Sequence, residues 1–143
     1  MLCARDYSFS EIEVNAEFTH KYTIDDTAYE MLVKVFQDKS PLHIDEDYAK
    51  SAGFAGRVMH GAILQGFLSH FVGMYFPGKK SLILAVSVNY HRPSYLGDEV
   101  SLTARVRQKV ETGRVIVLEV KFKNAASLAV VASGKVQVSL RDE

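Results

Sequence analysis

The stretch GAILQGFLSHFVGMY, residues 61–75, decides the fold of this chain of 143 residues. Large apolar side chains occur on almost every side of a helix built from it, which is typical of a helix surrounded by protein. One line of small residues differs, because the spacing i, i+4, i+7 and i+11 places its members on a shared face. These residues are Ala62, Gly66, Ser69 and Gly73. The pattern predicts a long central helix whose small-residue face lies tightly against a sheet.

Strand patterning surrounds this helix in the sequence, mostly on its C-terminal side. Apolar and polar residues alternate in the later segments, and the short connections at 111–113 and 124–127 permit only antiparallel neighbours. The expected strands are residues 16–22, 81–90, 100–107, 116–123 and 136–140. With one apolar and one polar face, they predict an α+β domain in which a curved antiparallel sheet of about five strands covers the long helix.

Two shorter helices are expected before the long one. The first begins at Thr23, carries acidic residues in its first turn and ends near residue 37 or 38. The second has Asp45 as its N-terminal cap and spans residues 46–51. The segment between the two helices contains Pro41 and is expected to be a loop.

The composition excludes several classes of protein. Lys plus Arg and Asp plus Glu each number 17, so no basic excess exists to neutralise phosphates, and nucleic acid is not an expected partner. A single cysteine, Cys3, cannot form an internal disulfide and favours a reducing, cytoplasmic location. No signal-length apolar run opens the chain and no run of about 20 residues has membrane-spanning character, so no membrane association is expected.

Asp38 and His43 are the first candidates for chemistry. The sequence has no phosphate-binding glycine loop, Cys/His cluster, nucleophile elbow or dinucleotide fingerprint. Pro41 holds the intervening loop extended, so the carboxylate and the imidazole can return to each other and share one water. The alternative, in which Asp38 only ends a helix and His43 is a surface loop residue, stays open.

Three further candidates lie at or within the long helix. Gly61 is its first residue, where free N–H groups suit a carbonyl oxygen that gains negative charge, although a glycine there also permits a tight turn. His60 either donates to a ligand or is a buried structural residue. Ser69 either orients a substrate or is present for its small size. His20 and His70 have no partners at metal-ligand spacing, so no metal site is expected.

Two motifs carry a resemblance to a known family. Residues 38–45, DKSPLHID, and residues 56–61, GRVMHG, resemble the signature of the MaoC-like (R)-specific enoyl-CoA hydratases. The later YHRPSYLGDEV, residues 90–100, resembles the strand, turn and Gly-Asp step of that family, so the similarity extends over nearly the whole chain. The resemblance implies one hot-dog domain over residues 1–143, with the long helix wrapped by the sheet. It also implies a homodimer or higher homo-oligomer whose subunits join their sheets.

The resemblance further implies reversible syn addition of water to a trans-2-enoyl thioester of CoA or acyl carrier protein, giving the (R)-3-hydroxyacyl thioester. Asp38 and His43 would activate the water and exchange a proton with the α-carbon, while the Gly61 amide bonds the thioester carbonyl. Ser69 falls where the family has a serine near the site. No metal or redox cofactor is implied. The family usually has Asn where this chain has Ser40, which leaves the position of the His43 loop and the substrate range open.

Two other functions remain open at this point. Hot-dog thioesterases would use a carboxylate on the long helix, whereas this helix carries Gln65 and no Asp or Glu between Gly61 and Phe76. A non-catalytic acyl-thioester-binding module would keep an apolar tunnel but would need neither Asp38 nor His43. Hydration is therefore the favoured prediction, with the hydrolase and the binding module as alternatives.

Overall fold

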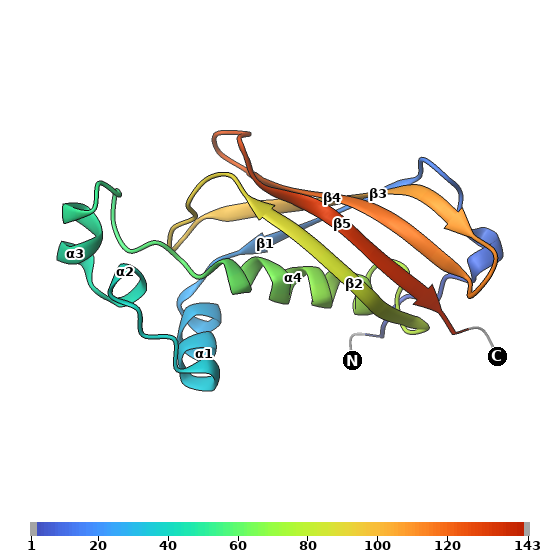
Figure 1. Ribbon diagram of the computed structural model, residues 1–143, viewed down its shortest axis with the longest axis horizontal. Coiled ribbons are helices and arrows are strands. Elements are labelled where there is room, and N and C mark those ends of the chain that lie inside the picture. The colour runs from blue at the N-terminus through green and yellow to red at the C-terminus, as the bar shows by residue number, and fades with distance from the viewer. Residues whose placement is uncertain (1–2, 142–143) are drawn as a thin grey trace.

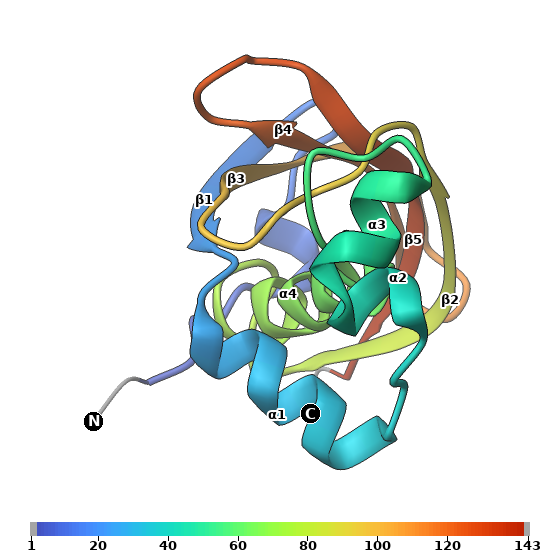
Figure 2. The same cartoon turned by 90° about the vertical axis from the view of Figure 1, so that its left-hand side faces the viewer.

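A five-stranded antiparallel sheet curves around one long helix in the computed structural model, which describes residues 3–141 (Figure 1). The strand order is β1-β3-β4-β5-β2, so β1 and β2 are the two edges. The strands are β1 (Glu17–Thr23), β2 (Ser81–Tyr90), β3 (Glu99–Val110), β4 (Val115–Asn124) and β5 (Val130–Leu140). Helix α4 (Gly61–Met74) lies inside the curve of the sheet, as the end-on view in Figure 2 shows. This arrangement confirms the predicted α+β hot-dog architecture.

Short helices gather near the N-terminal end of α4 (Figures 1 and 2). They are α1 (Asp26–Phe36), α2 (Pro41–Ile44) and α3 (Glu46–Ser51), and a 3-10 turn η1 (Phe9–Glu11) precedes β1. Asp25 caps α1 and Asp45 caps α3, because each carboxylate accepts a backbone N–H three residues later.

Two local predictions about these segments were wrong. Thr23 does not begin a helix, because it pairs with Glu99 at the end of β1, and the helix begins three residues later. The segment with Pro41 is not an open loop but a single helical turn, with proline at its first position. Proline suits that position because its missing N–H would have no helical partner there.

The core lies between α4 and the inner face of the sheet. The alternation predicted for the later strands is confirmed, since every second residue of β3 and β4 is buried over most of their length. From α4 the buried side chains are Ile63, Leu64, Leu68, Phe71 and Val72. Packing these against the strands holds the start of α4 in a fixed place relative to β2.

The small-residue face of α4 does not meet the sheet, so this prediction was wrong. Ala62, Gly66 and Ser69 are exposed, and Gly73 is partly exposed. The large apolar side chains take the sheet-facing side instead, because burying a leucine or phenylalanine removes far more apolar area from water than burying an alanine. One side of α4 is therefore open to a ligand or a partner.

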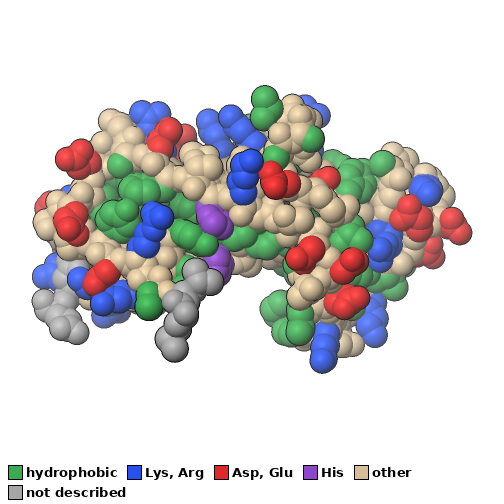
Figure 3. Space-filling view, turned by 180° about the vertical axis from the view of Figure 1, so that it is seen from behind, with side chains coloured by type: hydrophobic (Ala, Val, Ile, Leu, Met, Phe, Trp, Pro, Cys, Tyr) green, Lys and Arg blue, Asp and Glu red, His purple; other side chains and the backbone are tan. Residues whose placement is uncertain are grey.

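The surface carries charges of both signs. On the face shown in Figure 3, lysine and arginine side chains lie among those of aspartate and glutamate, as a formal net charge of zero leads one to expect. Cys3 is exposed. Within residues 3–141 no helix combines the length and the apolar character needed to cross a membrane.

We expect Gly134→Ala to destabilise the protein, because β2 and β5 approach closely at this residue. A Cβ atom at Gly134 would collide with the carbonyl oxygen of Ser87. Overpacking of this kind typically lowers the free energy of unfolding by about 1–3 kcal/mol. Urea unfolding monitored by circular dichroism measures the change.

The matched control is Gly66→Ala on the exposed side of α4. Nothing lies within 4 Å of the added Cβ there. Replacing a glycine inside a helix should raise the free energy of unfolding by about 0.5–1 kcal/mol. Equal unfolding midpoints for the Gly134 variant and the wild type would contradict the close approach of β2 and β5.

Candidate active site

Asp38 and His43 are brought together by the turn between α1 and α2. The Ser40 amide donates to Asp38 Oδ1 at 3.2 Å, which bends the chain directly before α2. The single turn of α2 then carries His43 back toward Asp38. The His43 Nε2 atom lies 4.0 Å from Asp38 Oδ2. The predicted meeting of the two side chains therefore matches their placement in the structure.

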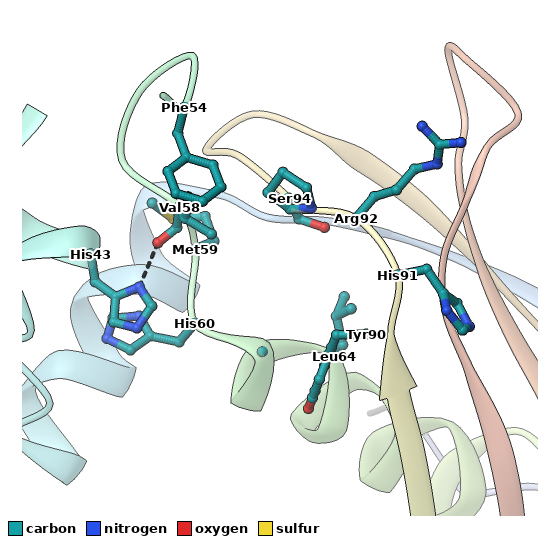
Figure 4. Close-up of a pocket in the computed structure, with 12 residues that line it drawn as sticks. His43, Phe54, Val58, Met59, His60, Leu64, Tyr90, His91, Arg92 and Ser94 are labelled. Atoms are coloured by element: carbon teal, nitrogen blue, oxygen red, sulfur yellow. Dashed lines mark hydrogen bonds between the residues drawn. The ribbon is translucent and has the colours of Figure 1, made fainter. Parts of the chain in front are cut away.

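The His43 ring is held in one orientation by the backbone before α4. Its Nδ1 atom donates to the Val58 carbonyl oxygen at 2.6 Å (Figure 4), and the Val58 amide in turn donates to the Leu42 carbonyl at 3.1 Å. Since Nδ1 carries the hydrogen, Nε2 of the neutral ring is a lone-pair acceptor. That acceptor faces the Asp38 carboxylate.

The gap between the two acceptors fits one water molecule. A separation of 4.0 Å is too long for a direct hydrogen bond, yet a water at about 2.8 Å from each atom bridges it. An ionised carboxylate and a neutral Nε2 both accept, so the water donates both of its hydrogens. Its lone pairs then point away from the pair, which is the orientation a nucleophile needs.

His60 contacts both members of the Asp38–His43 pair. Its side chain is almost fully buried, and Nε2 donates to the backbone carbonyl of Asp38 at 2.9 Å. The His60 and His43 ring centroids are 3.9 Å apart. Within residues 3–141 the Nδ1 atom of His60 has no hydrogen-bond partner. His60 therefore helps to fix the position of Asp38, and both roles considered from the sequence, contact with a ligand and a structural role, stay predictions.

Contacts with α1, α2 and α3 also hold the segment before α4. The Arg57 amide donates to Glu46 at 3.1 Å and, with Lys50, lowers the pKa of the Glu46 carboxyl. The Arg57 guanidinium lies 4.9 Å from the centre of the Tyr29 ring, whose hydroxyl donates to the His43 carbonyl oxygen at 3.3 Å. These contacts join α1, α2 and α3 to the start of α4.

Asp38, His43 and His60 also form a group whose nitrogen and oxygen atoms lie within 4.8 Å of one another, as ligands of a metal ion do. However, Nε2 of His60 already bonds the Asp38 carbonyl, and Nδ1 of His43 bonds the Val58 carbonyl. The lone pairs that remain belong to the Asp38 carboxylate, His43 Nε2 and the buried His60 Nδ1. Of these, the Asp38 carboxylate and His43 Nε2 face each other across 4.0 Å, a gap that fits a water.

A cavity of about 380 Å³ opens beside His43 and His60, and Gly61 forms part of its wall. The other lining residues are Phe54, Val58, Met59, Leu64, Tyr90, His91, Arg92, Pro93 and Ser94. Gly61 is the first residue of α4, where backbone N–H groups have no acceptor within the helix. The cavity thus combines apolar walls with an amide donor close to the His43 imidazole.

The five predicted site residues fall into two sets. Asp38, His43, His60 and Gly61 are brought together at the start of α4. Ser69 is exposed two turns further along α4 and does not line this cavity, so its role stays a prediction.

The sequence interpretation missed two contributors, the Val58 carbonyl and the Tyr90 ring. Every residue has a backbone carbonyl, so the residue type at position 58 does not indicate that its carbonyl accepts from His43. Tyr90 does have a signal, because it is the first residue of the motif at residues 90–100. In the structure an added Cβ at Gly61 would lie 2.7 Å from the Tyr90 ring, so the packing needs a glycine at residue 61.

Comparisons with known proteins agree with the fold. A family model described as "MaoC like domain" matches residues 9–127. The (R)-specific enoyl-CoA hydratase of Rhodospirillum rubrum is 25% identical over 133 residues, covering 93% of this chain and 92% of that protein. The (R)-specific enoyl-CoA hydratase of Aeromonas caviae is 30% identical over 103 residues, covering 71% and 77%. The unliganded R-hydratase PhaJ1 of Pseudomonas aeruginosa superposes with a TM-score of 0.89 at 21% identity, covering 98% of this chain and 89% of that one.

Proposed function

Since the chain belongs to the MaoC-like domain family, we propose that it catalyses the reversible addition of water to a trans-2-enoyl thioester, giving the (R)-3-hydroxyacyl thioester. The observation that carries the proposal is the water-sized gap between Asp38 and His43, beside a cavity walled by Gly61. The names of the two curated hydratase relatives support it.

The chemistry follows from the orientation of the bound water. Its oxygen attacks C3 of the enoyl group while His43 Nε2 takes one of its protons and Asp38 accepts a hydrogen bond from the other. The electron pair of the double bond moves toward the thioester oxygen, where the Gly61 amide stabilises the developing negative charge. The Asp38–His43 pair then gives one proton to C2. Because hydroxyl and proton come from the same pair, both add to the same face of the double bond.

The cavity suits an acyl thioester. Phe54, Met59 and Leu64 provide apolar wall for the acyl chain. Arg92 is the one lysine or arginine among the described residues that line it. A cation at this place favours the phosphate groups that CoA and the phosphopantetheine arm of acyl carrier protein share. Either carrier is therefore a proposed partner.

The deciding experiment mixes purified protein with crotonyl-CoA and follows both enoyl absorbance and free thiol. Hydration consumes the double bond without releasing a thiol, and chiral analysis should give the (R)-3-hydroxy product. Release of thiol would instead establish a hydrolase, and binding without either change would establish an acyl-thioester-binding module. Repeating the assay with crotonyl acyl carrier protein identifies the carrier.

We also propose that two copies pair through β2. This strand is an edge of the sheet, so one row of its backbone N–H and C=O groups lacks a strand partner within the described chain. It exposes apolar side chains at Leu82, Leu84 and Val86. Analytical ultracentrifugation should give twice the chain mass of 16.0 kDa.

Introducing lysine at both Leu84 and Val86 should shift the protein toward the monomer, because charged edge strands resist pairing. Leu128→Lys is the matched control, since Leu128 is also exposed but lies in the turn between β4 and β5. A wild type that sediments as a monomer at all concentrations would rule out the β2 interface.

A further inference from the structure

Tyr90 places a hydroxyl group beside the start of α4. Tyr90 is the last residue of β2, and its ring lies against Gly61. A Cβ atom added to Gly61 would be 2.8 Å from Tyr90 Cε1 and 3.1 Å from Tyr90 Oη. The phenol therefore lies next to the residue whose amide is proposed to bond the thioester oxygen.

Gln65 determines whether the Tyr90 hydroxyl donates or accepts. Its Nε2 atom donates to Tyr90 Oη at 2.8 Å. Gln65 lies four residues after Gly61 in α4, so both are on one face of the helix. A phenol has one O–H to donate and lone pairs to accept with. Because Gln65 occupies a lone pair, the O–H of Tyr90 is left to donate, and no hydrogen bond from it to another residue is found within residues 3–141.

We propose that Tyr90 is a catalytic residue whose O–H donates to the thioester oxygen together with the Gly61 amide, with Gln65 as the positioning residue. The inference rests on the proposed function, since it concerns the same thioester. An oxygen that gains negative charge during hydration has more than one lone pair, and donors that are already in place stabilise it without reorganisation. Gly61 and Tyr90 both line the cavity, and Tyr90 Oη lies 3.1 Å from the position of a Cβ atom on Gly61, so one thioester oxygen in this cavity can accept from both donors.

A competing role for Tyr90 is that of a cavity wall. The ring fills space against Gly61, and a wall would work equally well without the hydroxyl. The two roles make different demands, because only the donor role depends on the phenolic hydrogen. Tyr90→Phe separates them, since it keeps the ring and removes the O–H.

The test measures kcat and KM for crotonyl-CoA in three variants. Tyr90→Phe should lower kcat by about 10- to 10²-fold with little change in KM, at or below the lower end for loss of an oxyanion donor because the ring is half exposed. Gln65→Glu should give a similar loss although the phenol is still present, because the new carboxylate accepts the Tyr90 hydrogen. Gln65→Met removes the hydrogen bond that positions the phenol but offers no strong acceptor, so it should lower kcat less than Gln65→Glu does.

The outcomes separate this inference from the proposed function. If the wild type hydrates crotonyl-CoA and Tyr90→Phe has the same kcat, Tyr90 is a wall and the inference is wrong while the function stands. If Tyr90→Phe is slow but Gln65→Glu matches the wild type, the positioning role of Gln65 is overturned. A wild type with no hydratase activity overturns the function and this inference together. Thermal melting of each variant shows whether a loss of activity reflects a loss of folding.

Discussion

Replacing Asp38 by asparagine should lower kcat for crotonyl-CoA hydration by about 10²- to 10⁴-fold, the range of a lost general acid or base. Asparagine has the same shape, and its carbonyl oxygen can still accept the Ser40 amide as Asp38 Oδ1 does. It carries no negative charge, however, and its NH₂ group presents donors where the water needs an acceptor. The fold should be unaffected, because the Asp38 side chain is half exposed.

Asp47→Asn is the matched control for this change. Asp47 is exposed in α3 and does not line the cavity, so the same substitution there should leave kcat at the wild-type value. Steady-state kinetics and thermal melting on the two variants give the comparison. Wild-type turnover in the Asp38 variant would remove the carboxylate from the mechanism.

His43→Ala should cause a loss of the same size, about 10²- to 10⁴-fold in kcat, because it removes the acceptor for the water proton. The substitution should also lower the free energy of unfolding. The hydrogen bond from His43 to the Val58 carbonyl is lost, and such a bond typically contributes about 0.5–1.5 kcal/mol. Kinetics and urea unfolding measured on the same preparation distinguish the two effects.

Added imidazole tests whether His43 acts chemically. The alanine variant enlarges a cavity of about 380 Å³, which leaves room for a free imidazole beside Asp38. We expect imidazole to restore part of the lost kcat in His43→Ala and to have no effect on Asp38→Asn. A rate that stays low, with the unfolding midpoint strongly reduced, would instead assign His43 a structural role only.

Much of the fold could be predicted because its pattern is regular. Alternation over residues 100–107 and 116–123 determines both the strand identity and the buried face. A helix of four residues such as α2 has no periodicity to detect, so Pro41 was interpreted as part of a loop. The prediction that the small-residue face of α4 lies against the sheet was wrong for another reason. Spacing shows that residues share a face, but which face is buried depends on the competing faces as well.

The candidate site could be predicted only where its parts are close in sequence. Asp38 and His43 are five residues apart, so their meeting follows from one local turn. Tyr90 contacts Gly61 across 29 residues, and the acceptor for His43 is a backbone carbonyl at residue 58. Such contacts depend on how β2 and α4 pack, which a single sequence does not specify.

Three hydrogen bonds join the Asp38–His43 turn to the chain entering α4, from His43 to Val58, from Val58 to Leu42 and from His60 to Asp38. Since each segment restrains the other, both should behave as a single rigid unit before any acyl group arrives. The backbone amide of Val58 should then exchange with deuterium slowly, at a rate close to that of the sheet amides. A site assembled in advance needs no closure of these two segments before the chemical step, so kcat should depend little on solvent viscosity.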